Sequence, residues 1–264
     1  AAGCTVVCKP ANETPLSALA LGHYAIKAGV PDGVINILCG KTQEIGAALT
    51  GSPVVRKLSF TGSTAVGKML TAACASTMKR TSMELGGNAP FIIFADANLE
   101  AALDGLMASK FRNSGQTCVC ANRVLIAEEI TDQFTQMLVD RLSKSVIGNG
   151  LSQGTTIGPL IQKNAVAKVQ GLVAKAIEQG ATPVNPLHET PSTGNFVPPL
   201  ILKDVTADME IFDAEIFGPV ATLITLDRYD RTIKLAIKTA AGLAAYVCTQ
   251  DASTMIKATG QLEF

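Results

Sequence analysis

The chain has 264 residues, of which 47% are hydrophobic and 17% charged, with 22 basic residues against 22 acidic ones. This apolar content is enough for one large domain or two moderate ones, and the zero net charge gives no electrostatic reason to expect a nucleic acid or an anionic membrane as partner. No apolar run reaches the ~20 residues of a membrane span. Seven cysteines, scattered without zinc-ligand spacing, predict an intracellular, reducing compartment and no metal site.

Short β-branched runs alternate with helical patterns. A strand at residues 5–8 precedes a helix that should have Thr14 as N-cap, Pro15 at its first position and its end near Gly29. Further strands are expected at residues 34–38, 57–60, 90–94, 124–127, 221–226 and 244–249, and another strand ends at Glu84. Helices are expected at residues 99–112, 131–146, 165–179, 230–239 and 252–262. The alternation predicts an α/β fold of parallel sheets flanked by helices. Because paired glycines break both element types, Gly86-Gly87 predicts two domains, residues 1–86 and 87–264.

Cys118 follows the break of the helix that ends near Arg112. A thiol attacks as its thiolate, so a reactive cysteine needs partial exposure and local positive potential, which Arg112 and nearby backbone N–H groups could supply. Judged on this residue alone, a buried structural cysteine is the more common state.

A second segment, residues 60–67, follows a strand and opens a helix. Such a turn places backbone N–H groups and the positive end of a helix where a pyrophosphate could bind. The segment is not a G-x-G-x-x-G fingerprint, and a plain turn capped by Thr61 or Ser63 is the alternative.

Four motifs occur in an order and spacing that resemble the aldehyde dehydrogenase superfamily, and the resemblance runs from Ala1 to Phe264. They are Phe60-Thr61-Gly62-Ser63-Thr64, Glu84-Leu85-Gly86-Gly87-Asn88, Gly115-Gln116-Thr117-Cys118 and Glu215-Ile216-Phe217-Gly218-Pro219. The resemblance implies the second half of a Rossmann-like cofactor domain followed by a catalytic domain. It also implies NAD(P)-dependent oxidation of an aldehyde to an acid through a covalent thioester.

The resemblance assigns two catalytic residues. The cysteine matching Cys118 adds to the aldehyde carbonyl, and the glutamate matching Glu84 activates the water that hydrolyses the thioester. Without the resemblance, Glu84 would be an exposed glutamate that closes a strand.

The resemblance places the cofactor at Lys9, Asn12, Gly62, Ser63, Gly67, Leu85, Glu215 and Phe217. Glu215 would hold the nicotinamide ribose, while a core aromatic is the alternative reading of Phe217. Members that prefer NAD often carry an acid where this chain has Asn12. Since no carboxylate would repel a 2′-phosphate there, NADP use is weakly favoured over NAD, unless Glu13 compensates.

The longer string over residues 109–123 resembles the succinate-semialdehyde branch. In that branch the arginine matching Arg112 binds the distal carboxylate of the substrate, although Arg112 could instead neutralise a helix C-terminus. The branch commonly has a cysteine at Cys120, which predicts a reversible redox switch with Cys118, strained because the two lie at i and i+2. The alternatives are a dehydrogenase of glutarate semialdehyde or an ω-aminoaldehyde, or an inactive relative that serves as a binding or structural domain.

The chain opens without Met and ends within a helical pattern, so we expect a fragment that lacks both ends. By resemblance, the absent upstream part carries an oxyanion asparagine, so the isolated chain should have little or no activity. Residues 238–243 also depart from the branch pattern. The parent protein is expected to be a cytoplasmic or mitochondrial homodimer or homotetramer that acts on a small aldehyde.

Overall fold

The computed structural model describes residues 3–186 and 188–264, so residues 1 and 2 of the expected first domain lie outside the described residues. The chain forms two compact units, Ala1–Leu85 (unit 1) and Gly86–Phe264 (unit 2). Among the described residues, no helix is both long and apolar enough to cross a membrane.

Unit 1 consists of β1 (Val6–Cys8), α1 (Leu16–Lys27), β2 (Ile35–Ile37), α2 (Thr42–Gly51), β3 (Lys57–Thr61), α3 (Thr64–Ala75) and β4 (Arg80–Glu84). Its strands form two parallel pairs, β1 with β2 and β3 with β4. Helix α1 is assigned from Leu16, with Pro15 at the N-cap; Pro15 already has helical backbone angles (φ −79°, ψ −20°), close to its predicted place at the first helical position. No side chain caps this helix, so Thr14 is not the predicted cap.

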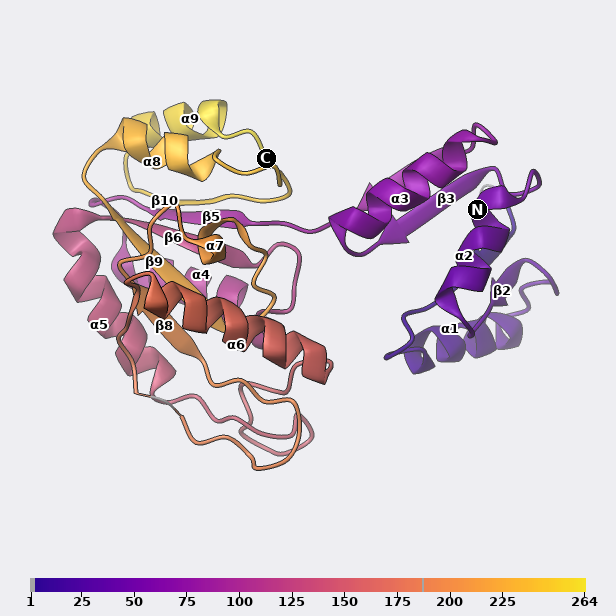
Figure 1. The fold of residues 1–264 in the computed structure, drawn as a ribbon, viewed down its shortest axis with the longest axis horizontal. Helices are drawn as coiled ribbons and strands as arrows, with labels where there is room; N and C mark the ends of the chain where they lie inside the picture. The colour runs from indigo at the N-terminus through magenta and orange to yellow at the C-terminus, as the bar shows by residue number, and fades with distance from the viewer. Residues whose placement is uncertain (1–2, 187) are drawn as a thin grey trace. The chain divides into compact units, whose positions relative to one another are not determined.

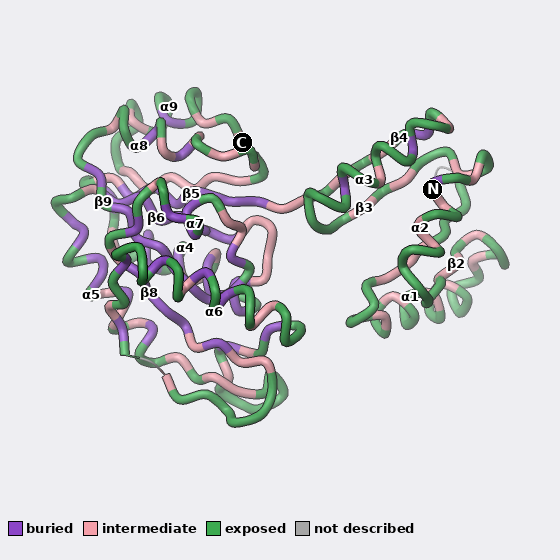
Figure 2. Tube along the Cα trace, viewed as in Figure 1, coloured by how far each residue is buried: buried purple, intermediate pink, exposed green. Residues whose placement is uncertain are grey.

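Most of unit 1 is exposed or half-buried, whereas buried residues dominate the strands of unit 2 (Figure 2). A buried lysine, Lys79, joins two elements of unit 1. Its ammonium donates to Thr50 O at 2.7 Å and to Ser52 O at 3.0 Å, at the end of α2. A cation at a helix C-terminus satisfies carbonyls that have no partner inside the helix.

Unit 2 is built on a six-stranded sheet in the order β10-β5-β6-β9-β8-β7 (Figure 1). Its strands are β5 (Ala89–Ile93), β6 (Ala121–Ala127), β7 (Thr182–Pro183), β8 (Leu200–Lys203), β9 (Val220–Leu226) and β10 (Tyr246–Cys248). All neighbours are parallel except β7, which is antiparallel to β8. The predicted α/β fold of parallel sheets flanked by helices is thus confirmed; β7 and β8 were not predicted.

Helices cover both faces of this sheet. They are α4 (Leu99–Leu106), α5 (Thr131–Leu142), α6 (Lys163–Glu178), α7 (Glu210–Asp213), α8 (Tyr229–Ala236) and α9 (Ala252–Gln261). Val124 and Ile126 of β6 pack in one core with α4 and α5, whereas Leu125 packs in the other with α6, α7, α8 and α9. Alternation along a strand therefore divides the buried surface between two cores.

Three predicted helices end early in the structure, at Leu106, Leu142 and Ala236. The helix expected at 99–112 ends at Leu106 and continues as a π-helical turn, η1 (Met107–Phe111). The helix expected at 230–239 ends at Ala236, where the guanidinium of buried Arg123 donates to the carbonyls of Leu235 and Ala236 at 2.6 and 2.8 Å.

Candidate active site

Cys118 lies on a tight turn in front of β6. After η1 the backbone enters the left-handed region at three consecutive residues, Asn113 (φ 52°), Ser114 (φ 56°) and Gly115 (φ 75°). Each non-glycine residue there costs about 1–3 kcal/mol, a strain that is typical of functional sites. The turn is closed by the Cys120 N–H, which donates to Thr117 O at 3.1 Å. Cys118 is partly exposed, so it is not the buried structural cysteine that its type alone favours.

Side-chain hydrogen bonds hold this turn from two sides. The Tyr246 hydroxyl on β10 donates to Val119 O at 2.7 Å, directly after the cysteine. Gln116 accepts from Ile161 N–H at 2.9 Å, and Ser114 donates to Gly158 O at 2.8 Å. These residues position the thiol. The role of Tyr246 could not be predicted from the sequence, because its hydroxyl reaches the turn only through the pairing of β10 with β5.

Two motif glycines are required by close backbone approach. A Cβ on Gly87 would lie 2.1 Å from the carbonyl oxygen of Cys118, and a Cβ on Gly115 would lie 2.2 Å from that of Gly218. No side chain fits at such distances, so the backbone of Gly87 packs directly against Cys118 and that of Gly115 against Gly218.

Glu215 is fixed by contacts on its side chain and its backbone. One carboxylate oxygen accepts from Gly87 N–H at 3.1 Å, and the Glu215 carbonyl accepts from Lys168 at 2.6 Å. Phe217 has a left-handed backbone (φ 55°) and a 37% exposed side chain, so it is not a core aromatic. Glu215 is thus half-buried and Phe217 exposed in this segment.

The buried side chain of Asn122 binds the backbone on both sides of Glu215. Its amide nitrogen donates to Ala214 O, and its amide oxygen accepts from Ile216 N–H at 3.4 Å. Asn122 also donates to Asn88 Oδ1 at 3.2 Å, and Asn88 is bound by Arg123. The roles of these residues could not be predicted from the sequence, because a polar residue within or next to a strand gives no signal for its distant partners.

Arg112 is exposed at the end of η1, and within the described residues no carboxylate lies within ion-pair distance of it. Its charge acts on Tyr246, whose pKa is raised overall by burial and by the neighbouring Cys120 and Cys118, while Arg112 opposes the rise. A guanidinium that has no carboxylate partner among the described residues can bind an anionic group near the thiol turn. Cys120, by contrast, is buried, with its sulfur 3.5 Å from Lys110 Nζ.

In unit 1 most of the predicted cofactor residues adjoin Glu84. The exposed Glu84 ends β4 opposite Thr61, and its carbonyl accepts from Gly62 N–H at 3.0 Å. Ser63 caps α3 through Val66 N–H at 3.4 Å. A Cβ on Gly67 would lie 2.4 Å from the Leu85 side chain, so this glycine permits the packing of α3 against the chain after β4.

Lys9 and Asn12 follow β1, in the other sheet of unit 1. Lys9 donates to Asn12 Oδ1 at 2.6 Å, and Asn12 donates to Thr42 at 3.2 Å, at the start of α2. Lys9 is half-buried, and no carboxylate of residues 3–186 or 188–264 forms an ion pair with it, which fits a phosphate-bearing cofactor. The structure describes Glu84 and these residues in unit 1, and Cys118, Glu215 and Phe217 in unit 2.

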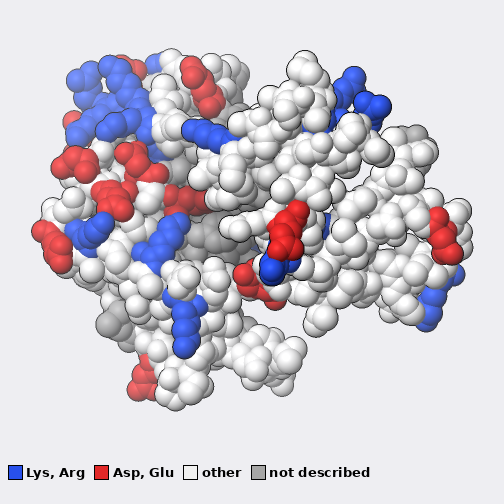
Figure 3. All heavy atoms as spheres, turned by 45° about the vertical axis from the view of Figure 1, so that its right-hand side comes forward, with Lys and Arg blue, Asp and Glu red and all other residues white. Residues whose placement is uncertain are grey.

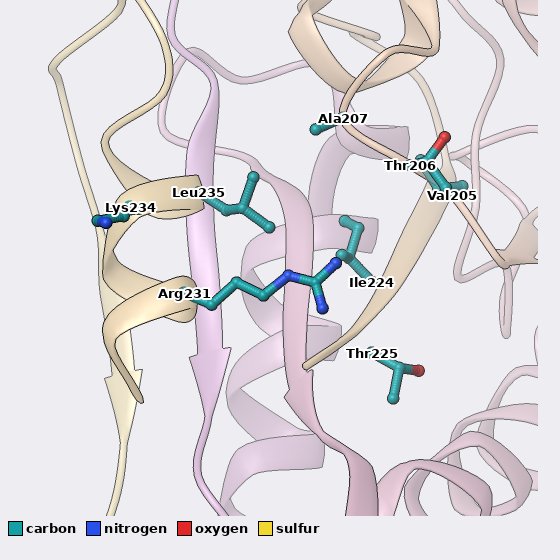
Figure 4. Close-up of a pocket in the computed structure, with 8 residues that line it drawn as sticks. All are labelled: Val205, Thr206, Ala207, Ile224, Thr225, Arg231, Lys234 and Leu235. Atoms are coloured by element: carbon teal, nitrogen blue, oxygen red, sulfur yellow. The ribbon is translucent and has the colours of Figure 1, made fainter. Parts of the chain in front are cut away.

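A hollow of about 350 Å³ lies elsewhere in unit 2 (Figure 4). It is lined by Val205, Thr206, Ala207, Ile224, Thr225, Arg231, Lys234 and Leu235. Ile224 and Thr225 are near the carboxyl end of β9, whereas Cys118 precedes the amino end of the parallel strand β6, so the hollow is at the opposite edge of the sheet. In Figure 3 a group of basic side chains at the upper left lies next to acidic ones, and much of the face in view carries neither kind.

The fold and the site define an α/β scaffold that presents an accessible cysteine on a strained turn. The sequence pattern of the aldehyde dehydrogenase family matches residues 1–264, and the chain belongs to this family. It is 50% identical to the NADP(+) succinate-semialdehyde dehydrogenase of Escherichia coli and 47% identical to the 3-sulfolactaldehyde dehydrogenase of Pseudomonas putida. These matches cover all of this chain and 55% and 54% of those proteins.

The structural comparison agrees with the family. A succinate-semialdehyde dehydrogenase from Burkholderia pseudomallei superposes with a TM-score of 0.97 at 44% identity, over all of this chain and 55% of that one. The chain thus spans about half the length of the relatives it matches.

Proposed function

We propose that the protein to which this chain belongs oxidises succinate semialdehyde to succinate with NAD(P). The observation that carries the proposal is the Cys118 turn, strained and held by Tyr246 and Gln116, with the unpaired Arg112 nearby. Support also comes from the two relatives, whose names each specify an aldehyde with a second, anionic group.

In the proposed reaction Cys118 attacks the aldehyde carbonyl as its thiolate and forms a thiohemiacetal. A nicotinamide cofactor, when bound, would supply the hydride acceptor for oxidation of this Cys118 adduct to a thioester. Glu84 then takes a proton from the water that hydrolyses the thioester, and Cys118 leaves as a thiolate. Glu215, Phe217, Ser63, Gly62, Gly67, Leu85 and Lys9 hold the cofactor, with Glu215 accepting from ribose hydroxyls.

Arg112 is the proposed selector of the substrate. Because hydrogen bonds to a charged group contribute about 1.5–3 kcal/mol, Arg112→Ala should lower kcat/KM for succinate semialdehyde by about 10–100-fold. The value for butanal, which lacks the carboxylate, should be almost unchanged. The exposed Arg228 at the start of α8 provides the matched control, Arg228→Ala, which should change neither value.

The assay follows reduced cofactor in a full-length enzyme that carries this chain. No turnover of succinate semialdehyde with either NAD or NADP would contradict the proposed activity and favour the inactive relative. A kcat/KM higher for glutarate semialdehyde or an ω-aminoaldehyde would favour those alternatives.

The proposed cofactor is NAD or NADP, with NADP favoured by Asn12. Asn12 binds Lys9 through a neutral amide, so the lysine keeps its charge for a 2′-phosphate. Asn12→Asp should therefore lower kcat/KM for NADP by about tenfold, as expected for ~1.4 kcal/mol, and leave that for NAD unchanged or higher. An equal change for both cofactors would show that Asn12 does not select between them.

We further propose a homodimer or homotetramer inside the cell, in the cytoplasm or the mitochondrion. Light scattering of the full-length enzyme measures the oligomeric state, and a monomer at micromolar concentration would contradict it.

A further inference from the structure

Lys110 is a buried lysine that the proposed mechanism does not use. It lies in the π-helical turn η1, and its side chain has 0% exposure. Within the described residues its ammonium has one polar contact, the sulfur of Cys120 at 3.5 Å. Burial of an amine without a strong acceptor costs free energy, so this contact calls for an explanation.

The contact joins the two flanks of the Cys118 turn. Lys110 precedes the turn and Cys120 ends it, immediately before β6. The Cys120 sulfur also lies 3.6 Å from the carbonyl oxygen of Lys110, so both ends of the lysine are next to the same sulfur. Because the side chains are 0% and 6% exposed, each has few positions available other than this contact.

We propose that Lys110 and Cys120 form a reversible covalent S–N bond when the protein meets hydrogen peroxide. Peroxide transfers one oxygen to the sulfur of Cys120, which gives a sulfenic acid and one water. Lys110 Nζ releases its ammonium proton to solvent, its lone pair then attacks this sulfur, the S–O bond breaks, and the hydroxyl leaves as a second water with a further proton from the nitrogen. The sulfur is oxidised by two electrons and the peroxide is reduced to two waters, so no other oxidant is required.

The lysine is a better placed partner for Cys120 than the neighbouring thiol. A disulfide between Cys118 and Cys120 is an i,i+2 link near the limit of allowed Cα separation. The amine is already in contact with the Cys120 sulfur, whereas Cys118 lies at the turn with a partly exposed side chain. The S–N bond would leave the Cys118 thiol free, and a thiol reductant would release both residues.

The experiment treats the chain with a slight excess of hydrogen peroxide, alkylates the remaining thiols and digests with trypsin. The S–N bond joins peptide 81–112 to peptide 113–123, since trypsin no longer cleaves after Lys110. The joined pair should weigh two hydrogens less than the sum, carry an alkylated Cys118, and separate in dithiothreitol. A disulfide between Cys118 and Cys120 would instead close a loop inside peptide 113–123.

Matched variants complete the test. Cys118→Ser should retain the joined peptides, and Lys110→Met should abolish them; Lys144→Met, the same change at an exposed lysine, should have no effect. A looped peptide 113–123, a Cys120 oxidised to sulfinic acid, or normal cleavage after Lys110 would overturn the proposal. Since the peptide pair is measured in the unaltered chain, the result does not depend on how the Lys110 variant folds or on the proposed activity.

Discussion

Replacement of Asn122 with alanine should destabilise unit 2 by about 3 kcal/mol. Its buried amide makes three hydrogen bonds, donating to Ala214 O and Asn88 Oδ1 and accepting from Ile216 N–H. A hydrogen bond contributes about 1 kcal/mol, and a buried partner left unpaired costs about 1–3 kcal/mol. Because the 3.4 Å bond to Ile216 is long, we expect the free energy of unfolding to fall by about 3 kcal/mol, at the lower end of the range that these contributions add up to.

Urea denaturation followed by tyrosine fluorescence can measure this loss in unit 2. The chain has no tryptophan and three tyrosines. Tyr229 and Tyr246 lie in unit 2 and Tyr24 in unit 1, so a Tyr24→Phe background confines the signal to unit 2. Linear extrapolation then yields the free energy of unfolding for each variant.

A control and a local measurement separate the mechanism from general damage. Asn149 is exposed, and among the described residues its side chain makes one hydrogen bond, accepting from Leu151 N–H at 3.0 Å, so Asn149→Ala should change stability by less than about 0.5 kcal/mol. Asn122→Ala should also speed amide hydrogen exchange at Ile216, beside Glu215. A loss below about 1 kcal/mol, or unchanged exchange at Ile216, would refute the reasoning.

Two further predictions concern the thiol turn and a second cysteine. Gly115→Ala should lower the free energy of unfolding by more than about 3 kcal/mol, because the backbone is left-handed (φ 75°) and the new Cβ would lie 2.2 Å from Gly218 O. The control is Gly150→Ala, whose new Cβ would have no atom within 4 Å. Equal urea midpoints for the two variants would contradict the prediction. Burial raises the pKa of Cys248 to about 11, so its alkylation rate should rise about tenfold per pH unit between pH 7 and 10, whereas a plateau near pH 9 would contradict this shift.

Local patterns in the sequence predicted much of the scaffold. Alternating strand and helix patterns predicted the parallel α/β architecture, and the motif around Cys118 predicted a broken helix followed by an accessible thiol. These features depend on near neighbours. Glycines permit sharp turns, and fully apolar strands such as β5 are typical of sheets covered on both faces.

The boundaries of two helices and the burial of several polar residues could not be predicted in this way. The end of α8 depends on Arg123, about 110 residues earlier in the chain, which donates to its last carbonyls. The change from α4 to the π-helical turn η1 buries Lys110 against Cys120, although its sequence resembles an ordinary helix end.

By itself the sequence therefore determined the α/β class, the family resemblance and the identity of the candidate thiol, since each depends on residue types at short spacing. Tertiary structure alone decided that Tyr246 holds the turn, that Asn122 brackets Glu215, and that Lys110 contacts Cys120. Polar side chains become buried only where distant or folded-back segments supply partners, and sheet pairing brings those segments together.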